Sequence, residues 1–418
     1  MKKTLTSFFT LLILAGQTSA QKYYICDGFT YKEKDITENI QLPTDWTDID
    51  SITFAAPQYK KVEIKYNGSS AQVTIAEGVK GVTCTSGTSS HVILNSTTTS
   101  DEYLYTLSGT STDGSLTING SYKLSLELDG VSLTSTKGAA VDIECGKRID
   151  VLVKEGTVNT FSDSKNGQQK AAFYTKGHIE FKGGGTINIT GNTKHALAAK
   201  EYLEFKGSFG TANILGAVSD GIHCGKGEKG DSENNYFLIN GGNITISGCG
   251  SDCIDTDDYG TAYIKGGSLH MDITQEDGVG LKTDSMIYMT GGDVTANVSG
   301  NISDGIRCSY TAKFSGGTYT ASVKGNGSRG IRGKKVSVSS TATVTGGGNL
   351  EFSGTNVVMT VSGGTNASDQ TKCFGIKADK ILSQTGGDIT IDVTNSAGID
   401  IKAGTDNWTG GTRNGKIK

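Results

Sequence analysis

Four stretches of this sequence repeat one pattern: GGNITIS (241–247), GGSLHMDI (266–273), GGDVTANV (291–298) and GGTYTASV (316–323). Each begins with a glycine pair, and each pair follows the previous one after 25 residues. The residues behind the glycines alternate between apolar and polar, which is typical of a β-strand with one buried face. A β repeat of this length without helical segments predicts an all-β fold in which each repeat forms one turn of a parallel β-helix.

A second marker runs in phase with the glycine pairs. It is a small residue followed by an apolar one, as in Gly221-Ile222, Gly305-Ile306 and Gly330-Ile331. The next residue is mostly polar, and the one after it is again small or apolar. We therefore expect the apolar members to point inward and the polar ones to form an outward stripe. His223 is the one histidine on that stripe, and as a lone histidine it is interpreted as a surface polar residue.

The composition excludes several classes of protein. The 418 residues include 59 glycines but two prolines, so a collagen is excluded. A hydrophobic share of 35% and a net charge of −4 are not those of a disordered chain. No basic face is available for nucleic acid, so a nucleic-acid partner is not expected.

The chain is expected to have three parts. Residues 1–20 carry Lys2 and Lys3 before a short apolar run and end in small residues, which predicts a signal peptide. Residues 21–60 lie outside the repeat and are assigned to an N-terminal cap, and residues 61–418 to the β-helix. No stretch is long and apolar enough to span a membrane. We expect an exported monomer without membrane insertion, extracellular, on the cell surface or in the periplasm.

Acidic residues recur two positions before the inward apolar member. In four coils they would form a ladder of carboxylates about 5 Å apart. Such a ladder either faces solvent or holds a hard cation, and calcium takes six to eight oxygen ligands with loose geometry. Common Asp-Gly turn chemistry is the alternative reading. The ladder residues are Asp220, Asp252, Asp277 and Asp304, and the neighbouring candidate ligands are Asp255, Asp257 and Asp258.

The outward stripe also permits an enzymatic interpretation. Arg307 or Arg332, with Lys282 and Lys377 nearby, would serve as the base of a calcium-dependent uronate lyase. The alternative is a solvated basic position on a β surface. Arg307 is also a candidate for binding a polysaccharide. Candidate aromatic residues for stacking on a sugar, or simply half-buried turn aromatics, are Tyr259, Tyr310 and Trp408.

The cysteines offer one close pair. Cys249 and Cys253 flank a predicted turn, and an even number of cysteines in an exported chain permits a disulfide between them. Neither a CxxC pair nor an HExxH helix accompanies them, so zinc is not expected there.

The run from Tyr105 to Ile143, YTLSGTSTDGSLTI…KLSLELDGVSLTSTKGAAVDI, together with the segments SDGIHC and SDGIRC, resembles a bacterial family. This is the carbohydrate-binding β-helix family, whose best-known members are cellulose- and pectin-binding proteins of cellulolytic clostridia. The resemblance covers about residues 100–400. It implies a right-handed parallel β-helix related in shape to pectate lyases, calcium held between coils, and binding of acidic or β-linked polysaccharide without established catalysis.

The resemblance also implies the calcium ligands, which are the acidic residues of the Asp-Gly-Ile steps and of the variant Asp252-Cys253-Ile254 step. The pattern changes after Asp304, because Arg329 and Phe374 stand where further acids are expected. The sequence thus predicts a secreted, non-catalytic, calcium-stabilised β-helix that binds a pectin-like or β-glucan cell-wall polysaccharide. The two alternatives are a pectate-type lyase and a structural surface adhesin with a protein ligand.

Overall fold

The computed structural model describes residues 22–27, 30–35, 51–54 and 60–418 apart from 166–168, 226–233, 258–259, 337–345, 416 and 418. The chain divides into two units, residues 1–60 and residues 61–418. In the first unit three strands form an antiparallel sheet of order β2-β1-β3: β1 (Lys22–Asp27), β2 (Thr30–Asp35) and β3 (Ser51–Phe54). The predicted signal peptide lies outside the described residues, and the role of residues 21–60 as a cap stays a prediction.

The second unit begins with short antiparallel pairs and then becomes parallel. β4 pairs with β5 and β6 with β7 in antiparallel fashion, whereas β4–β8 and β7–β9 are parallel. The strands are β4 (Lys61–Asn67), β5 (Ser70–Ile75), β6 (Val82–Cys84), β7 (His91–Ser96), β8 (Leu104–Ser111) and β9 (Ser115–Asn119).

From β10 (Leu124–Thr134) onward the strands fall into three series, and within each series every strand pairs in parallel with the next member. The first series continues from β9 and carries the site described below. Its strands are β11 (Val141–Glu144), β14 (Ala171–Thr175), β17 (His195–Ala199), β20 (Ile222–Cys224), β23 (Ile254–Asp255), β26 (Val279–Thr283), β28 (Asp304–Cys308) and β30 (Arg329–Gly333).

The other two series run beside the first. The second contains β12 (Ile149–Val153), β15 (Ile179–Lys182), β18 (Leu203–Phe205), β21 (Tyr236–Ile239) and β24 (Thr261–Ile264). The third contains β13 (Val158–Ser162), β16 (Thr186–Gly191), β19 (Thr211–Ala217), β22 (Asn243–Ile246) and β25 (Ser268–Ile273).

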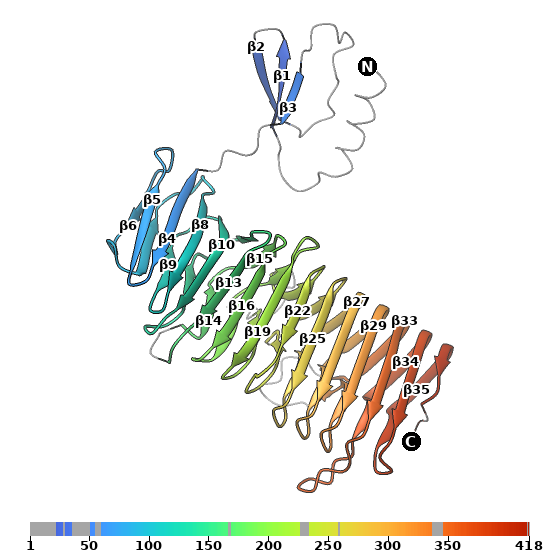
Figure 1. Cartoon of the computed structure of the whole chain (residues 1–418). Helices are drawn as coiled ribbons and strands as arrows, with labels where there is room; N and C mark the ends of the chain where they lie inside the picture. Colours follow the sequence, from blue (N-terminus) through green and yellow to red (C-terminus); the bar gives the residue numbers. More distant parts are fainter. Residues whose placement is uncertain are drawn as a thin grey trace. The chain divides into compact units, whose positions relative to one another are not determined.

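Towards the C-terminal end, single long strands take part in two or three of the series. β27, β29 and β33 each span the second and third series, and β34 and β35 continue all three (Figure 1). These strands are β27 (Met286–Val298), β29 (Thr311–Val323), β33 (Asn349–Val361), β34 (Phe374–Val393) and β35 (Ile399–Arg413). A two-residue antiparallel pair, β31 (Lys335–Val336) and β32 (Gly346–Gly347), precedes β33.

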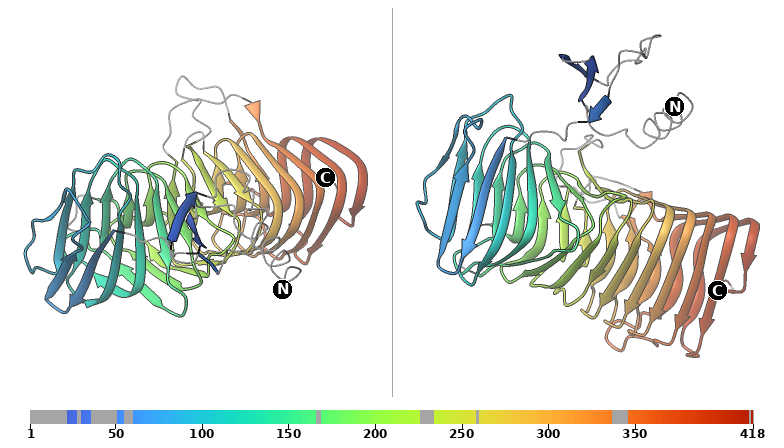
Figure 2. Two further views of the ribbon diagram at one scale, coloured as in Figure 1. Left: turned by 90° about the horizontal axis from the view of Figure 1, so that it is seen from above. Right: turned by 45° about the horizontal axis from the view of Figure 1, so that its top comes forward.

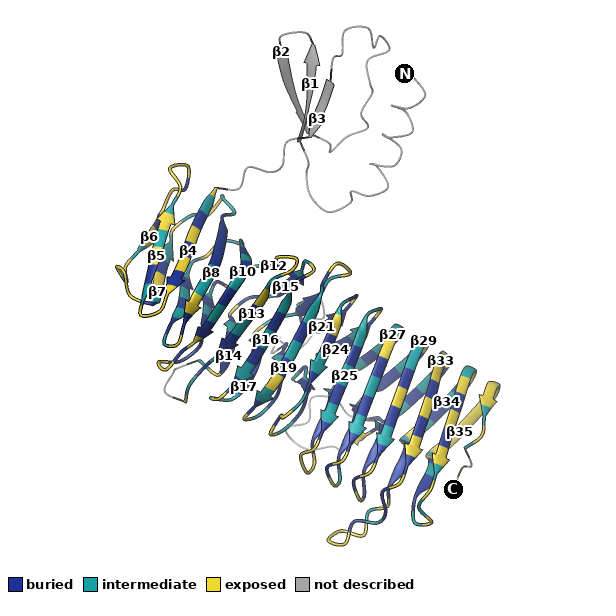
Figure 3. Ribbon diagram, in the orientation of Figure 1, coloured by how far each residue is buried: buried dark blue, intermediate teal, exposed yellow. Residues whose placement is uncertain are grey.

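Figure 2 shows the strands of successive turns side by side, and the registers agree with the sequence period. Ile244 pairs with Leu269, and Leu269 with Val294, each 25 residues further on. The predicted all-β structure with parallel strands is therefore confirmed. Figure 3 shows buried and exposed residues alternating along the strands, as the apolar–polar pattern predicts. Among the described residues there is no helix of the length and apolarity needed to cross a bilayer.

The glycine pairs have a steric cause. The second glycine of a pair adopts a left-handed conformation, with φ of +77° at Gly292 and +75° at Gly317. At the first glycine, a Cβ on Gly291 would lie 2.4 Å from the backbone oxygen of Lys265 in the preceding turn. Side chains at these corners would therefore force the stacked turns apart.

Candidate functional site

The first series brings polar side chains into two columns. The outer column consists of the residues that follow the inward apolar member, and strand pairing aligns them from one turn to the next. Its members are Asp142, Tyr174, Ala198, His223, Asp255, Lys282, Arg307, Arg332, Lys377 and Lys402. The buried column lies three residues earlier in each turn, and its members are His195, Asp220, Asp252, Val279, Asp304, Arg329 and Phe374.

The predicted carboxylate ladder is wrong at one turn. Ile254 pairs with Leu281 rather than Val279, so Val279 occupies the ladder position beside Asp252 and Asp304. Asp277 lies two residues outside the column, with φ of 55° and a side chain that is 72% exposed. Three acidic residues of the four therefore share the buried column: Asp220 and Asp252 are on consecutive turns, and Val279 separates them from Asp304.

Asp304 is neutralised by arginines of its own chain. Its side chain is fully buried, Arg307 Nε donates to Oδ2, and Arg329 Nε donates to Oδ1. Arg332 Nη1 lies 3.8 Å from Oδ2. Burial alone would raise the pKa of Asp304, but these guanidinium groups hold the pKa below its usual range. Both oxygens are thus occupied, and Asp304 does not fit a calcium ligand.

A lysine takes the corresponding place beside Asp252 and Asp255. Lys282 Nζ lies 3.1 Å from Oδ2 of each carboxylate. The other oxygen of Asp252 accepts a hydrogen bond from Val279 N at 2.9 Å, and that of Asp255 accepts one from Asp257 N at 3.1 Å. Burial raises the pKa of Asp252 to about 6, because the lysine offsets the cost of desolvation only in part.

Asp220 lies between two histidines. Its Oδ2 is 3.1 Å from Nδ1 of His195 and 3.4 Å from Nδ1 of His223, and Oδ1 accepts a hydrogen bond from Asp252 N at 3.2 Å. Burial would raise the pKa of Asp220, but the histidines hold it well below its usual range. Burial lowers the pKa of His195. On the outer side, Nε2 of His223 lies 3.7 Å from Oδ2 of Asp257.

The expected calcium ligands thus separate into several groups. Carboxylate oxygens of Asp220, Asp252 and Asp255 lie within 4.8 Å of one another, which is close enough for one ion. Every oxygen of this group already faces a donor or cation of the chain, so calcium would have to displace Lys282. Asp258 and Tyr259 lie outside the described residues.

The outer column becomes basic towards the C-terminal end, and positive charge is in excess there. Burial, with the neighbouring Arg329 and Arg307, holds the pKa of the Arg332 guanidinium below its usual range. Burial likewise lowers the pKa of Lys334 and of Lys377. Nε of Arg332 is buried without a hydrogen-bond partner. We call this group, together with Arg307, the cationic cluster: Arg307, Arg329, Arg332, Lys334 and Lys377.

A row of aromatic side chains on the second series was not foreseen. The rings of Tyr202 and Tyr236 are 4.5 Å apart and nearly parallel, and those of Tyr263 and Tyr288 are 5.3 Å apart and nearly parallel. His178 stacks on Tyr202 at 4.4 Å, whereas Tyr236 meets Tyr263 edge to face at 6.0 Å. The rings therefore cover one another's faces, and a sugar would meet mainly edges and hydroxyl groups. The recurrence of tyrosine shortly before or within successive apolar strand segments was the available signal.

The other predicted aromatic residues do not join this row. Tyr310 is exposed in the turn before β29. Trp408 is 52% exposed, yet it pairs in register with Gln384, which continues the inward column of Phe314 and Phe352. The Arg413 guanidinium lies 5.0 Å from the Trp408 ring centre. Trp408 thus aligns with the inward column on the last strand but stays exposed, an alignment that its turn-like sequence context did not suggest.

The predicted disulfide is absent. Cys249 and Cys253 are both buried free thiols. The two thiols interact with each other, which together with burial raises the pKa of Cys253. Their sulfur atoms also approach backbone oxygens, Cys249 Sγ that of Ser247 at 3.7 Å and Cys253 Sγ that of Asp272 at 3.8 Å. Both thiols therefore pack in the hydrophobic core as small apolar side chains.

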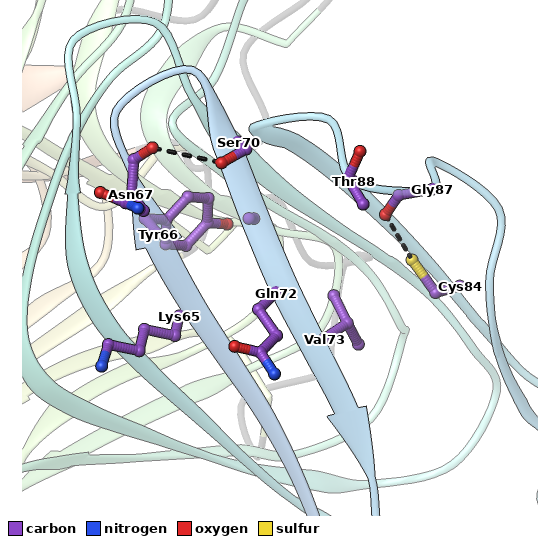
Figure 4. Close-up of a pocket in the computed structure, with 10 residues that line it drawn as sticks. Lys65, Tyr66, Asn67, Ser70, Gln72, Val73, Cys84, Gly87 and Thr88 are labelled. Atoms are coloured by element: carbon purple, nitrogen blue, oxygen red, sulfur yellow. Dashed lines mark hydrogen bonds between the residues drawn. The ribbon is translucent and has the colours of Figure 1, made fainter.

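A hollow of about 710 Å³ lies beside the hairpin of β4 and β5 (Figure 4). Lys65, Asn67, Ser70 and Gln72 line it, and the ring of Tyr66 is almost entirely buried beneath. It gathers none of the residues predicted to bind metal or carbohydrate.

Comparison with known proteins agrees with a binding role. The family described as "Carbohydrate-binding domain-containing protein" matches residues 88–415, and the chain belongs to this family. A relative of the same description from Acetivibrio thermocellus is 26% identical over 114 residues, which are 25% of this chain and 40% of the relative. This chain thus matches two fifths of that relative's length.

A solved structure, the polysaccharide lyase-like protein from C. thermocellum in a gadolinium derivative, is also similar. It has a TM-score of 0.44 and 20% sequence identity, and the match covers 64% of this chain and 93% of that one. This degree of similarity carries no conclusion about function.

Proposed function

We propose that this protein binds an acidic, uronate-containing polysaccharide through the cationic cluster, without cleaving it. Membership of the carbohydrate-binding family supports a polysaccharide partner. The excess of positive charge around Arg332 supports an acidic one. Carboxylate recognition by a guanidinium uses charge-assisted hydrogen bonds, and the Arg332 side chain is 18% exposed. The excess of positive charge around this guanidinium is the observation on which the proposal rests.

The fold inferred with this function is a right-handed parallel β-helix whose three faces are the three strand series. Stacked turns repeat the cations along one face about 4.8 Å apart. An extended polyanion can then meet several of them at once, which adds binding without any deep pocket. A neutral β-glucan would depend more on open aromatic faces, and the tyrosine row offers few. Export to the cell exterior, surface or periplasm belongs to the same proposal.

Calcium enters this proposal as a competitor of Lys282. The ion would take the position between Asp252 and Asp255, where the ammonium group now neutralises both carboxylates. Calcium favours several oxygen ligands in a loose geometry, and the adjacent Asp220 can supply one more. The ion would then stiffen the contact between successive turns.

A lyase remains the second candidate, and Arg332 is the observation that favours it. Its lowered pKa brings the guanidinium closer to acting as a base. It would take the proton beside the uronate carboxyl group while the bond to the leaving sugar oxygen breaks and a carbon–carbon double bond forms. Arg307 fits that role poorly, because Asp304 and Asp277 hold its pKa above the usual value against the effect of burial. A surface adhesin has no comparable supporting observation among the described residues.

The test is electrophoresis through gels containing polygalacturonate. We expect the wild type to be retarded with the polymer left intact, and Arg332→Gln and Lys377→Gln to be retarded less. Lys154→Gln is the matched control, because this exposed lysine is paired with Asp129 at 2.7 Å on another strand series. Equal retardation of all variants would contradict the assigned surface. A cleared track and ultraviolet absorbance of an unsaturated product would instead establish the lyase.

A further inference from the structure

The His195–Asp220–His223 group differs chemically from the rest of the ionic face. Its three ligand atoms are two imidazole nitrogens and one carboxylate oxygen, all within 4.8 Å of one another. On this face the buried Asp252 is paired with Lys282, and the buried Asp304 with Arg307 and Arg329. Among the described residues Asp220 forms no ion pair with a lysine or arginine, and its ion-pair partners are the two histidines.

The two rings approach the carboxylate in a way that hydrogen bonds do not explain. They are parallel, with centres 4.3 Å apart and an angle of 12° between their planes. Nδ1 of each ring is buried and makes no hydrogen bond, although both nitrogens face the same oxygen. The side chain of His195 is 3% exposed, so bulk solvent does not reach its Nδ1.

The spacing fits a metal ion of borderline softness. Tetrahedral zinc has bonds of about 2.0–2.1 Å to nitrogen and oxygen, which places its ligand atoms about 3.3 Å apart. The Nδ1-to-Oδ2 separations here are 3.1 Å and 3.4 Å. Imidazole nitrogen suits zinc, copper or nickel rather than calcium. Asp257 lies 3.7 Å beyond the far nitrogen of His223, where a carboxylate commonly orients a metal-bound histidine.

We propose that His195, Asp220 and His223 form a binding site for a divalent transition metal, with zinc as the expected ion. The site joins β17 to the start of β20 and so ties two successive turns together. Three protein ligands leave a fourth position for water or for an oxygen of a bound molecule. His223 belongs to the outer column and is 23% exposed, so solvent has access from that side. The proposal does not depend on which polysaccharide the cationic cluster binds.

The experiment is calorimetric titration of the full chain with zinc chloride after removal of metals by chelation. We expect one zinc per chain, at least about tenfold weaker binding for His223→Gln and for Asp220→Asn, and none for the double variant H195Q/H223Q. His178→Gln is the matched control, because His178 pairs with a single carboxylate, Glu201, at 2.6 Å on another series. A cobalt titration should give the visible absorption of a four-coordinate histidine-containing site.

Three outcomes would overturn the proposal. They are no zinc binding by the folded wild type, unchanged affinity in His223→Gln, or loss of zinc binding in His178→Gln to the same extent. Circular dichroism of each variant establishes folding. If the double variant does not fold, the partly exposed His223→Gln decides alone. Asp220 is shared with the calcium proposal, so the two sites are separated by His223→Gln, which should weaken zinc binding and leave calcium binding unchanged, and retention on polygalacturonate is scored independently.

Discussion

Arg329 donates from Nε to Oδ1 of Asp304 in the preceding turn, and the two side chains are only 3% and 0% exposed. Arg307 donates to the other oxygen of the same carboxylate. The buried carboxylate of Asp304 therefore offsets the positive charge of several residues of the cationic cluster. This arrangement explains how guanidinium groups can be stacked on neighbouring turns, where their mutual repulsion would otherwise push the turns apart.

Removing that charge should be costly. Asp304→Ala would leave buried guanidinium groups unpaired, and breaking a buried ion pair from one side costs about 3–5 kcal/mol. We expect a loss of this size in the free energy of unfolding measured by urea denaturation. Asp277→Ala is the control, since its exposed carboxylate contacts Arg307 only at the surface and should change stability by less than about 1 kcal/mol. Similar losses in both variants would contradict the central role of Asp304.

Asp142 should make stability depend on pH. Burial raises its pKa to about 6, and nearby Glu144 adds to the effect. The folded chain therefore holds a proton here that the unfolded chain has released, so stability falls as the pH rises from about 4 to about 7. A shift of this size corresponds to about 2–3 kcal/mol. Asp142→Asn should be more stable than the wild type at pH 8 and no more stable at pH 4. A constant difference across this range, measured by thermal unfolding, would contradict the assignment.

Lys282 should control calcium binding. Lys282→Gln removes the ammonium group that neutralises Asp252 and Asp255. We expect the variant to unfold at lower temperature in chelator and to regain stability with calcium chloride, with an affinity at least about tenfold above that of the wild type. The wild type is titrated in parallel. Equal calcium affinities would mean that the ion binds away from these two carboxylates.

The sequence predicts the parallel strands because the glycine corners recur at a fixed interval, as the pairing of Ile244 with Leu269 shows. The prediction that Asp277 belongs to the carboxylate ladder fails for a definite reason. The turn contains two small–apolar pairs, Gly278-Val279 and Gly280-Leu281, and both apolar side chains are buried. Local pattern cannot choose between them, since a shift of two residues keeps the same side chains inward. The choice is made by pairing with Ile254 in the adjacent turn.

The histidine pair was accessible to sequence reasoning but was missed. His195 stands two residues before the inward Leu197, the position that Asp220 occupies one turn later. A pattern restricted to acidic residues at that position leaves out His195, and without His195 the neighbouring His223 is a lone histidine in the sequence. Salt bridges between turns are different, because they depend on side-chain rotamers that no spacing rule fixes. Nothing in the sequence indicates that Lys282 Nζ rests between two aspartates.

The tyrosine row should matter for stability more than for binding. Tyr263 stacks on Tyr288 and meets Tyr236 edge to face, so Tyr263→Ala should cost about 1–3 kcal/mol of unfolding free energy. Retention on polygalacturonate should change less than about twofold, because the ring faces are covered by neighbouring rings and the cationic cluster lies on another series. Tyr310→Ala is the control, since this ring is exposed and should cost less than about 0.5 kcal/mol. Loss of polygalacturonate retention in Tyr263→Ala without loss of stability would instead make the row a sugar-binding platform, and it would move the proposed binding surface from the cationic cluster to the second series.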